Sequence, residues 1–249
     1  MFKQKKLARF LLMQFRHEPT LRHQEWQAIK RSAKLQRSQL ITYDAIVYGP
    51  PNNKTIDGYH APIIGGASDF CVSQTHNSRP ITECISLTRD IIDSSKPLLG
   101  ICFGFHMIIK ALGGSISYEP NKPEIGGVQI ELHPQSEQDP LFRGIKTSIL
   151  AISAHQDMVY QLPPECILLP DNPRCLRATR VKKKPIWGLQ FHAEAIPKLI
   201  KAQFPSYQSK KSNDKIALKT LLKSIVKTRE ANKLVRRFAE YVQHHLLFD

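Results

Sequence analysis

The feature that most constrains this chain is an alternation between short segments that are apolar at almost every position and segments whose apolar residues recur at helical spacing. A strand without a polar face must be covered on both sides, which is typical of a parallel sheet between two layers of helices. The sequence therefore predicts a three-layer α/β/α fold with a mostly parallel central sheet. The strands are predicted at residues 8–15, 39–48, 61–64 and 97–101, and the helices at 20–35, 80–95 and 103–112.

The pattern changes beyond Gly114, where short strands follow one another with few helices between them. This change predicts a small antiparallel excursion before the sheet is completed. An amphipathic stripe then predicts a last helix near 231–246. We expect a single domain over residues 1–249, with a basic helical insertion at 197–228. The short strands are predicted near 115–118, 125–132, 147–152, 165–169, 174–181 and 185–191.

Charge is unevenly distributed along the 249 residues, which carry a formal net charge of +15. Residues 1–38 contain ten Lys and Arg against two Asp and Glu, and residues 196–249 contain twelve against four, whereas the centre is close to neutral. Basic ends can serve an anionic partner or can be solvated helix faces, and both interpretations stay open. Because no helix-turn-helix, zinc-finger or RNA-recognition motif is present, we do not expect a nucleic-acid partner.

Cysteine usage and hydropathy indicate the compartment. The apolar stretch near the N-terminus is interrupted by Arg9 and ends at Arg16 without a small-residue cleavage site, so we do not expect a signal peptide. The five cysteines include no CxxC pair, which argues against a disulfide framework and against a zinc site. No apolar run reaches the roughly 18–20 residues that span a bilayer. We therefore expect a cytoplasmic protein with no membrane partner.

The strongest chemical signal is the segment 96–104, which reads KPLLGICFG. Gly100 and Gly104 flank Cys102 at two residues on either side, which permits a sharp turn from a buried strand into a helix and lifts the thiol above the sheet. A cysteine at a helix N-terminus favours a reactive thiolate, and the N–H of Phe103 points toward the space where an oxyanion would form. The alternative is a core cysteine in a tight turn.

A thiolate needs a base, and the base needs an orienting group. The segment 186–194, IWGLQFHAE, supplies both, because an apolar strand delivers His192 near its carboxyl end. If the chain stays extended through Ala193, Glu194 lies on the same side as His192. Cys102 and His192 would then meet where sites assemble in open α/β sheets. Taken alone, His192 could equally be a structural histidine.

The two motifs together resemble the Cys-His-Glu triad of class I, triad-type glutamine amidotransferases, whose second motif reads Q-F-H-P-E. The resemblance covers residues 8–195 and resumes in the last helix. It implies a flavodoxin-like fold and a catalytic triad of Cys102, His192 and Glu194. It also implies an oxyanion hole made by the backbone N–H groups of Gly66 and Phe103.

The segment 153–157 (SAHQD) resembles the S-H-G-D segment of the GMP-synthase glutaminase branch, which includes stand-alone relatives that cleave γ-glutamyl peptides. His155 and Asp157 are accordingly expected to bind substrate, together with His106, which stands where the family has Gln. Imidazole cannot reproduce the simultaneous donor and acceptor of an amide, so the substrate amide is left open. Two further departures are Ala193 for the motif proline and Gln156 for the glycine.

The resemblance implies that Cys102 forms a γ-glutamyl thioester from glutamine and that His192 protonates the departing ammonia, with no cofactor and no metal. No phosphate-binding P-loop is present, so the ammonia acceptor is expected to be bound by a separate synthetase subunit. The insertion 197–228 could dock such a subunit. One alternative is a γ-glutamyl peptide hydrolase that works alone, and another is a non-catalytic module with a basic binding surface.

Overall fold

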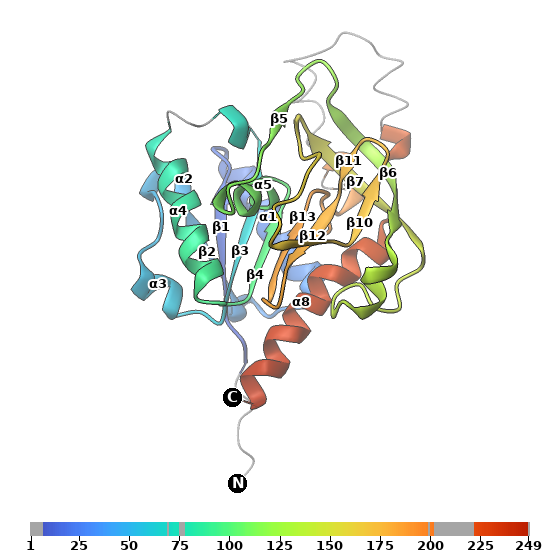
Figure 1. Ribbon diagram of the computed structural model, residues 1–249. Coiled ribbons are helices and arrows are strands. Elements are labelled where there is room, and N and C mark those ends of the chain that lie inside the picture. The colour runs from blue at the N-terminus through green and yellow to red at the C-terminus, as the bar shows by residue number, and fades with distance from the viewer. Residues whose placement is uncertain (1–6, 69, 75–77, 199, 202–221, 249) are drawn as a thin grey trace.

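The central feature of the computed structural model, which describes residues 7–68, 70–74, 78–198, 200–201 and 222–248, is a seven-stranded sheet (Figure 1). The strand order is β2-β1-β3-β4-β13-β12-β9, and neighbours are parallel from β2 to β13, whereas β12 and β9 run antiparallel. The predicted mostly parallel sheet is therefore confirmed. The strands are β1 (Phe10–Phe15), β2 (Leu40–Asp44), β3 (Ala61–Ala67), β4 (Leu98–Ile101), β9 (Cys166–Leu168), β12 (Ala178–Val181) and β13 (Ile186–Leu189).

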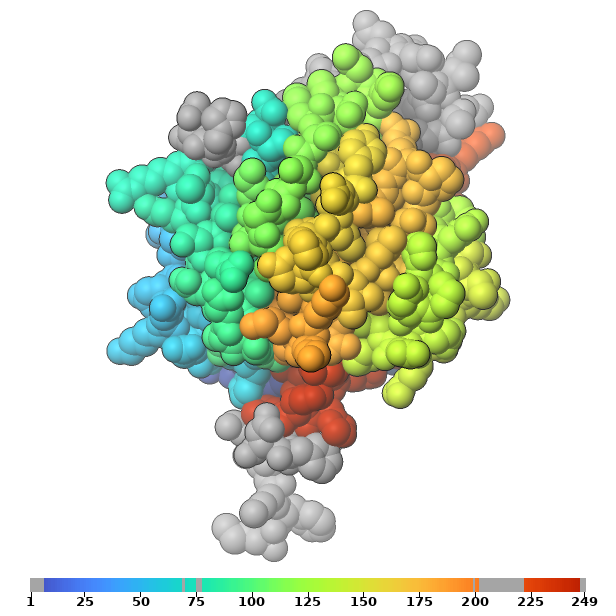
Figure 2. Space-filling model, viewed as in Figure 1, coloured from blue at the N-terminus to red at the C-terminus, as the bar shows by residue number. Residues whose placement is uncertain are grey.

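Helices cover both faces of this sheet. One layer holds α1 (Pro19–Ala33) and α8 (Arg229–Phe248), and the other holds α4 (Arg79–Asp93) and α5 (Phe103–Ala111). The C-terminal end of α8 emerges beneath the segments that hide the rest of this helix in Figure 2. The three-layer α/β/α architecture is thus the one that the sequence predicts.

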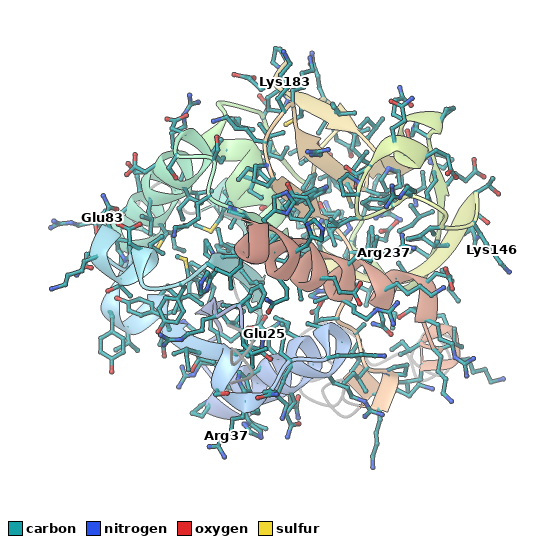
Figure 3. The ribbon with its side chains drawn as sticks, turned by 90° about the horizontal axis from the view of Figure 1, so that it is seen from below. Glu25, Arg37, Glu83, Lys146, Lys183 and Arg237 are labelled. Carbon is teal, nitrogen blue, oxygen red and sulfur yellow. The ribbon has the colours of Figure 1, made fainter. Side chains whose placement is uncertain are left out.

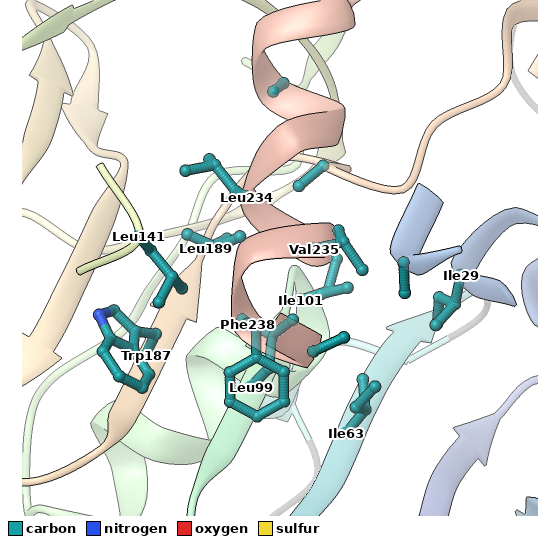
Figure 4. Close-up of a cluster of buried hydrophobic side chains, with 14 of the residues drawn as sticks. Ile29, Ile63, Leu99, Ile101, Leu141, Trp187, Leu189, Leu234, Val235 and Phe238 are labelled. Carbon is teal, nitrogen blue, oxygen red and sulfur yellow. The ribbon is translucent and has the colours of Figure 1, made fainter. Parts of the chain in front are cut away.

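The two-residue period of the strands explains why both layers bind tightly. In β1, Phe10 and Leu12 face α1 and α8, whereas Leu11 and Met13 face α4 and α5, and all four are buried. Burying each such side chain contributes about 1.5–3 kcal/mol. Figure 4 shows the first of these clusters, in which side chains of α8 meet those of the sheet: Ile63, Leu99, Ile101, Trp187, Leu189, Leu234, Val235 and Phe238.

The antiparallel excursion forms beside the main sheet, as predicted. It contains a four-stranded sheet of order β11-β10-β6-β7 and a two-stranded pair, β5-β8. The strand predicted at 174–181 is in fact two, which separate at Arg177 because this residue turns into the interior. The strands are β5 (Ser117–Tyr118), β6 (Glu124–Leu132), β7 (Ser148–His155), β8 (Asp157–Met158), β10 (Pro170–Asn172) and β11 (Cys175–Leu176).

A second correction concerns the strand predicted at 39–48, which stops at Asp44. The Asp44 carboxylate accepts hydrogen bonds from the N–H groups of Ile46 (3.1 Å) and Val47 (3.2 Å), and this N-cap starts the short helix α2 (Ala45–Tyr48). Further short helices are α3 (Asn53–Asp57), η1 (Arg37–Gln39), η2 (Val72–Gln74) and η3 (Pro134–Gln138).

Most of the insertion predicted at 197–228 lies outside the described residues, which omit 202–221. At its two ends Ile200 and Ile225 belong to one small apolar cluster with Ile152 of β7. Within the described ranges, none of the helices is long and apolar enough to cross a membrane. The same ranges contain no cluster of three His, Cys, Asp or Glu side chains that could hold a metal ion.

The order β2-β1-β3-β4-β13 determines where a site can form. It is the flavodoxin-like order, in which ligands bind at the carboxyl ends of the strands, close to the point where strand order reverses. The carboxyl ends of β1, β3, β4 and β13 are followed by Arg16, Ser68, Cys102 and Gln190.

Candidate active site

Cys102 occupies a sharp turn between β4 and α5. Its backbone has φ 53° and ψ −98°, a conformation that L-residues rarely adopt. A Cβ atom on Gly100 would lie 2.5 Å from the Gly104 carbonyl oxygen, and one on Gly104 would collide with the carbonyl oxygen of Ile64. Both glycines are therefore required for the helix to start so close to the sheet.

The thiol of Cys102 lies just beneath the surface, with 5% of the residue exposed. Its backbone N–H donates to the carbonyl oxygen of Leu189 (2.7 Å), which ties the turn to β13, and Sγ lies 3.8 Å from the carbonyl oxygen of Ala154. The segments 98–102, 153–154 and 189–192 thus converge on the sulfur.

His192 and Glu194 form a buried pair in which His192 Nδ1 lies 2.8 Å from Glu194 Oε1. The expectation that an extended strand places them on one side is wrong in its geometry, because β13 ends at Leu189 and a turn makes the pair. The N–H of Ala195 donates to the carbonyl oxygen of His192 (3.1 Å), and the N–H of His192 donates to that of Ile152 (2.8 Å).

Electrostatics favour the charged form of this pair. Burial lowers the pKa of His192, but the Glu194 carboxylate and the neighbouring Cys102 sulfur outweigh it and raise the pKa to about 10. Burial likewise raises the pKa of Glu194, yet His192 and, more weakly, Arg16 bring it below its usual value. The arrangement suits an imidazolium held between a carboxylate and a thiolate.

The two backbone amides expected to bind an oxyanion have different environments. Phe103 is the first residue of α5, where helical geometry provides no intrahelical acceptor for its N–H. The N–H of Gly66 instead donates to Glu25 Oε1 at 2.9 Å. In this structure the Gly66 amide is therefore occupied by a side chain that no motif in the sequence indicates.

The three residues expected to bind substrate are buried in a polar network behind the turn. His106 Nε2 lies 2.6 Å from Gln190 Oε1, and burial, although opposed by Asp157, lowers the pKa of His106 to about 4. The Asp157 carboxylate accepts hydrogen bonds from the N–H (3.1 Å) and the hydroxyl of Ser73. His155 Nδ1 lies 2.9 Å from the Asp157 carbonyl oxygen. These side chains have protein partners, and substrate binding by them stays a prediction.

Two buried ion pairs beside the triad were not predicted from the sequence. Arg177, whose side chain is fully buried, makes a two-pronged contact with Glu124, which also bonds His155. Arg16 bonds Glu25 through Nε at 3.0 Å. A charge at the end of an apolar strand, as in Arg16, was the available signal, but its partner could not be identified without the fold.

An open pocket of about 800 Å³ lies beside His192 and Glu194. Arg16 and Glu25 line it together with Ser153. Its remaining walls are largely apolar, and they include Leu21, Ala28, Ile125, Ile152, Ile196, Ile200 and Ile225.

A cysteine on a strand-to-helix turn, with a His–Glu pair at the end of the next strand, defines a cysteine-triad site on a flavodoxin-like sheet. The model of the class I glutamine amidotransferase family matches residues 51–208, and the chain belongs to this family.

Named relatives match part of the chain. It is 30% identical over 119 residues to the glutamine-hydrolysing subunit of the GMP synthase of Methanopyrus kandleri, a match that covers 47% of this chain and 58% of that protein. It is 34% identical over 112 residues to the glutamine-hydrolysing GMP synthase of Helicobacter pylori, covering 44% of this chain and 20% of that one. The match thus spans little more than half of the first relative.

Solved structures match over nearly the whole chain. A glutamine amidotransferase from Thermotoga maritima superimposes with a TM-score of 0.76 at 20% identity, covering 96% of this chain and 99% of that one. A second glutamine amidotransferase, from Methylobacillus flagellatus, gives 0.69 at 17% identity, covering 94% of this chain and 95% of that one. At these identities the likeness concerns the fold.

Proposed function

We propose that this protein hydrolyses the side-chain amide of glutamine, or of a γ-glutamyl compound, through a thioester on Cys102. The observation that carries the proposal is the combination of the strained Cys102 turn with the His192–Glu194 pair at 2.8 Å. Family membership supports the reaction class, since the matched relatives are named as glutamine-hydrolysing.

In the first half of the reaction, the Cys102 thiolate adds to the carboxamide carbon. The oxyanion is stabilised by the N–H of Phe103, with the N–H of Gly66 as a second donor once it is free. The imidazolium of His192 gives its proton to the departing nitrogen, which leaves as ammonia and yields the γ-glutamyl thioester.

In the second half, the now neutral His192 takes a proton from water while the water oxygen attacks the thioester carbonyl. Glutamate leaves, and the thiolate and imidazolium are restored. Glu194 keeps the imidazole in the required tautomer and stabilises its cation throughout.

The direct experiment measures release of ammonia and glutamate from glutamine. Wild-type protein should release both in equal amounts, and Cys102→Ala should release neither. If wild type turns over no glutamine or γ-glutamyl amide, and an electrophilic thiol reagent fails to label Cys102 in preference to the other four cysteines, the proposal is wrong.

We further propose that the ammonia acceptor is bound by a separate synthetase subunit, because two of the matched relatives are named as GMP synthases or as one of their subunits. The insertion 197–228 and the other basic flank suit an acidic partner surface. Deletion of 202–221 should leave glutamine hydrolysis intact and abolish co-purification with the synthetase. A deletion variant that still co-purifies would contradict this assignment of the docking segment.

A second candidate, hydrolysis of γ-glutamyl peptides without a partner, is favoured by the pocket beside His192. The leaving amine departs toward the group that protonates it, and this side is walled by apolar residues such as Ile152 and Ile196. Ammonia needs no such space, whereas a peptide or amine does. Comparing kcat/KM for glutamine with that for γ-glutamyl-leucine separates the candidates, because the second predicts a higher value for the peptide.

A further inference from the structure

The loop that carries Gly66 departs from the regular ladder between β1 and β3. Met13 pairs with Ile64 and Phe15 pairs with Ala67, so β3 uses three residue steps where β1 uses two. The extra residue is a β-bulge, a feature that redirects backbone groups and is common next to active sites. The bulge turns the Gly66 N–H out of the ladder and toward α1.

The acceptor on α1 is the carboxylate of Glu25, whose side chain is only 2% exposed. Oε1 accepts from the Gly66 N–H (2.9 Å) and Arg16 Nε (3.0 Å), and Oε2 accepts from Gln14 Nε2 (3.0 Å). Glu25 lies inside the outline of the molecule in Figure 3, whereas other labelled charged side chains lie at its edge. Charge-assisted hydrogen bonds of this kind are about twice as strong as neutral ones, and burial keeps water from competing.

Glycine is required at both loop positions that approach this carboxylate. A Cβ atom on Gly65 would lie 2.6 Å from Glu25 Oε1. One on Gly66 would lie 2.9 Å from Arg16 Nη2 and 3.0 Å from His192 Cε1. The loop is therefore wedged between the ion pair and the imidazole of the triad, and its two glycines leave the backbone free to reorient.

We propose that Glu25 is a positioning residue that withholds the Gly66 amide from the oxyanion, so that release of this amide limits the rate. An N–H that points at a carboxylate cannot point at the oxyanion at the same time. The negative charge of Glu25 beside the hole also disfavours the charge that develops in the transition state. The inference rests on the proposed function of Cys102, and it adds a residue on a different helix that controls it.

The alternative is that Glu25 only supports the loop, and the two roles predict opposite signs. If Glu25 withholds the amide, Glu25→Ala should raise kcat at least about tenfold, up to the 10²–10³ that one oxyanion donor is worth, with little change in KM. Glu25→Gln should give a smaller rise, because its carboxamide oxygen still accepts from Gly66 but without charge. If Glu25 is only a support, both variants should be slower than wild type.

A matched control is Gln14→Leu, which removes a hydrogen bond from the same carboxylate but leaves the Gly66 contact in place. It should lower the midpoint of thermal unfolding, as the Glu25 variants should, without raising kcat. Because Glu25→Ala also uncovers the Arg16 cation, the comparison is repeated as Arg16→Met against Arg16→Met/Glu25→Leu. The double variant should again be the faster of the two.

The experiment measures kcat and KM for glutamine and for γ-glutamyl-leucine in wild type and all these variants. Faster turnover in Glu25→Ala, and in the double variant over Arg16→Met, supports the proposal. Active wild type with equal or slower Glu25 variants overturns the proposal but leaves the function of Cys102 intact. No turnover in wild type or any variant overturns it too, and with it the proposed function.

Discussion

His192 Nδ1 lies 2.8 Å from Glu194 Oε1, only two residues further along the chain, and a turn rather than an extended strand brings them together. The pair is buried, so each charge depends on the other. Replacing one partner therefore affects both the chemistry and the stability.

The first prediction concerns catalysis by Glu194→Gln. The change removes the largest influence that raises the pKa of His192, so the imidazole loses its cationic form and its fixed tautomer. We expect kcat for glutamine hydrolysis to fall by about 10²-fold or more, within the 10²–10⁴ range of acid–base contributions. Steady-state assays with circular dichroism as a folding control test this. An unchanged kcat in a folded variant would remove Glu194 from the triad.

The second prediction concerns stability and pH. The raised pKa of His192 gives stability that is complete below its ordinary value of 6.5, declines above it and is lost as the pH rises through about 10. The lowered pKa of Glu194 gives stability that is present above its ordinary value of 4.5 and is lost as the pH falls. The difference in free energy of unfolding between wild type and Glu194→Gln should therefore peak between pH 4.5 and 6.5 and shrink at alkaline pH. Urea titrations across this range measure it, and a flat difference would disagree.

The third prediction concerns the turn that holds Cys102. Gly104→Ala introduces a Cβ atom that collides with the Ile64 carbonyl, and backbone cannot yield cheaply. We expect a loss of about 1–3 kcal/mol in the free energy of unfolding, together with loss of activity. Gly58→Ala is the control, because Gly58 is helical (φ −68°) and its nearest neighbour lies 3.3 Å from the added atom. It should leave stability nearly unchanged.

The fourth prediction concerns the buried ion pair behind the site. Glu124→Ala leaves Arg177 buried without its carboxylate, and breaking such a pair from one side costs about 3–5 kcal/mol. Chemical denaturation measures this cost. Glu83→Ala, which breaks an exposed contact with Arg79, serves as the control and should have no comparable effect. Equal losses in the two variants would argue against a structural role for Arg177.

Local patterns predicted much of this fold. Strands without a polar face, such as β1 and β4, predicted the parallel sheet, and the glycines around Cys102 predicted the turn that the structure contains. The chain after Asp44 was predicted as strand because its residues are apolar, and a side-chain cap overrode that pattern.

The site could be predicted only in part. Cys102 and His192 stand in motifs whose spacing reflects local geometry. Glu25 and Arg16 meet through tertiary packing between α1 and the end of β1, and no periodicity in the sequence reports a buried ion pair. The occupied amide of Gly66 is a consequence of that packing, so it could not be predicted from the loop itself.

The central claim is tested most directly by trapping the acyl-enzyme. Wild-type protein is mixed with saturating glutamine, quenched in acid and digested, and the peptide that contains Cys102 is examined by mass spectrometry. A γ-glutamyl adduct should appear on Cys102 in wild type, should accumulate further in a variant with impaired deacylation such as His192→Asn, and should be absent from Cys102→Ala. Release of glutamate by Cys102→Ala at the wild-type rate, or an adduct on another residue in its place, would contradict the account.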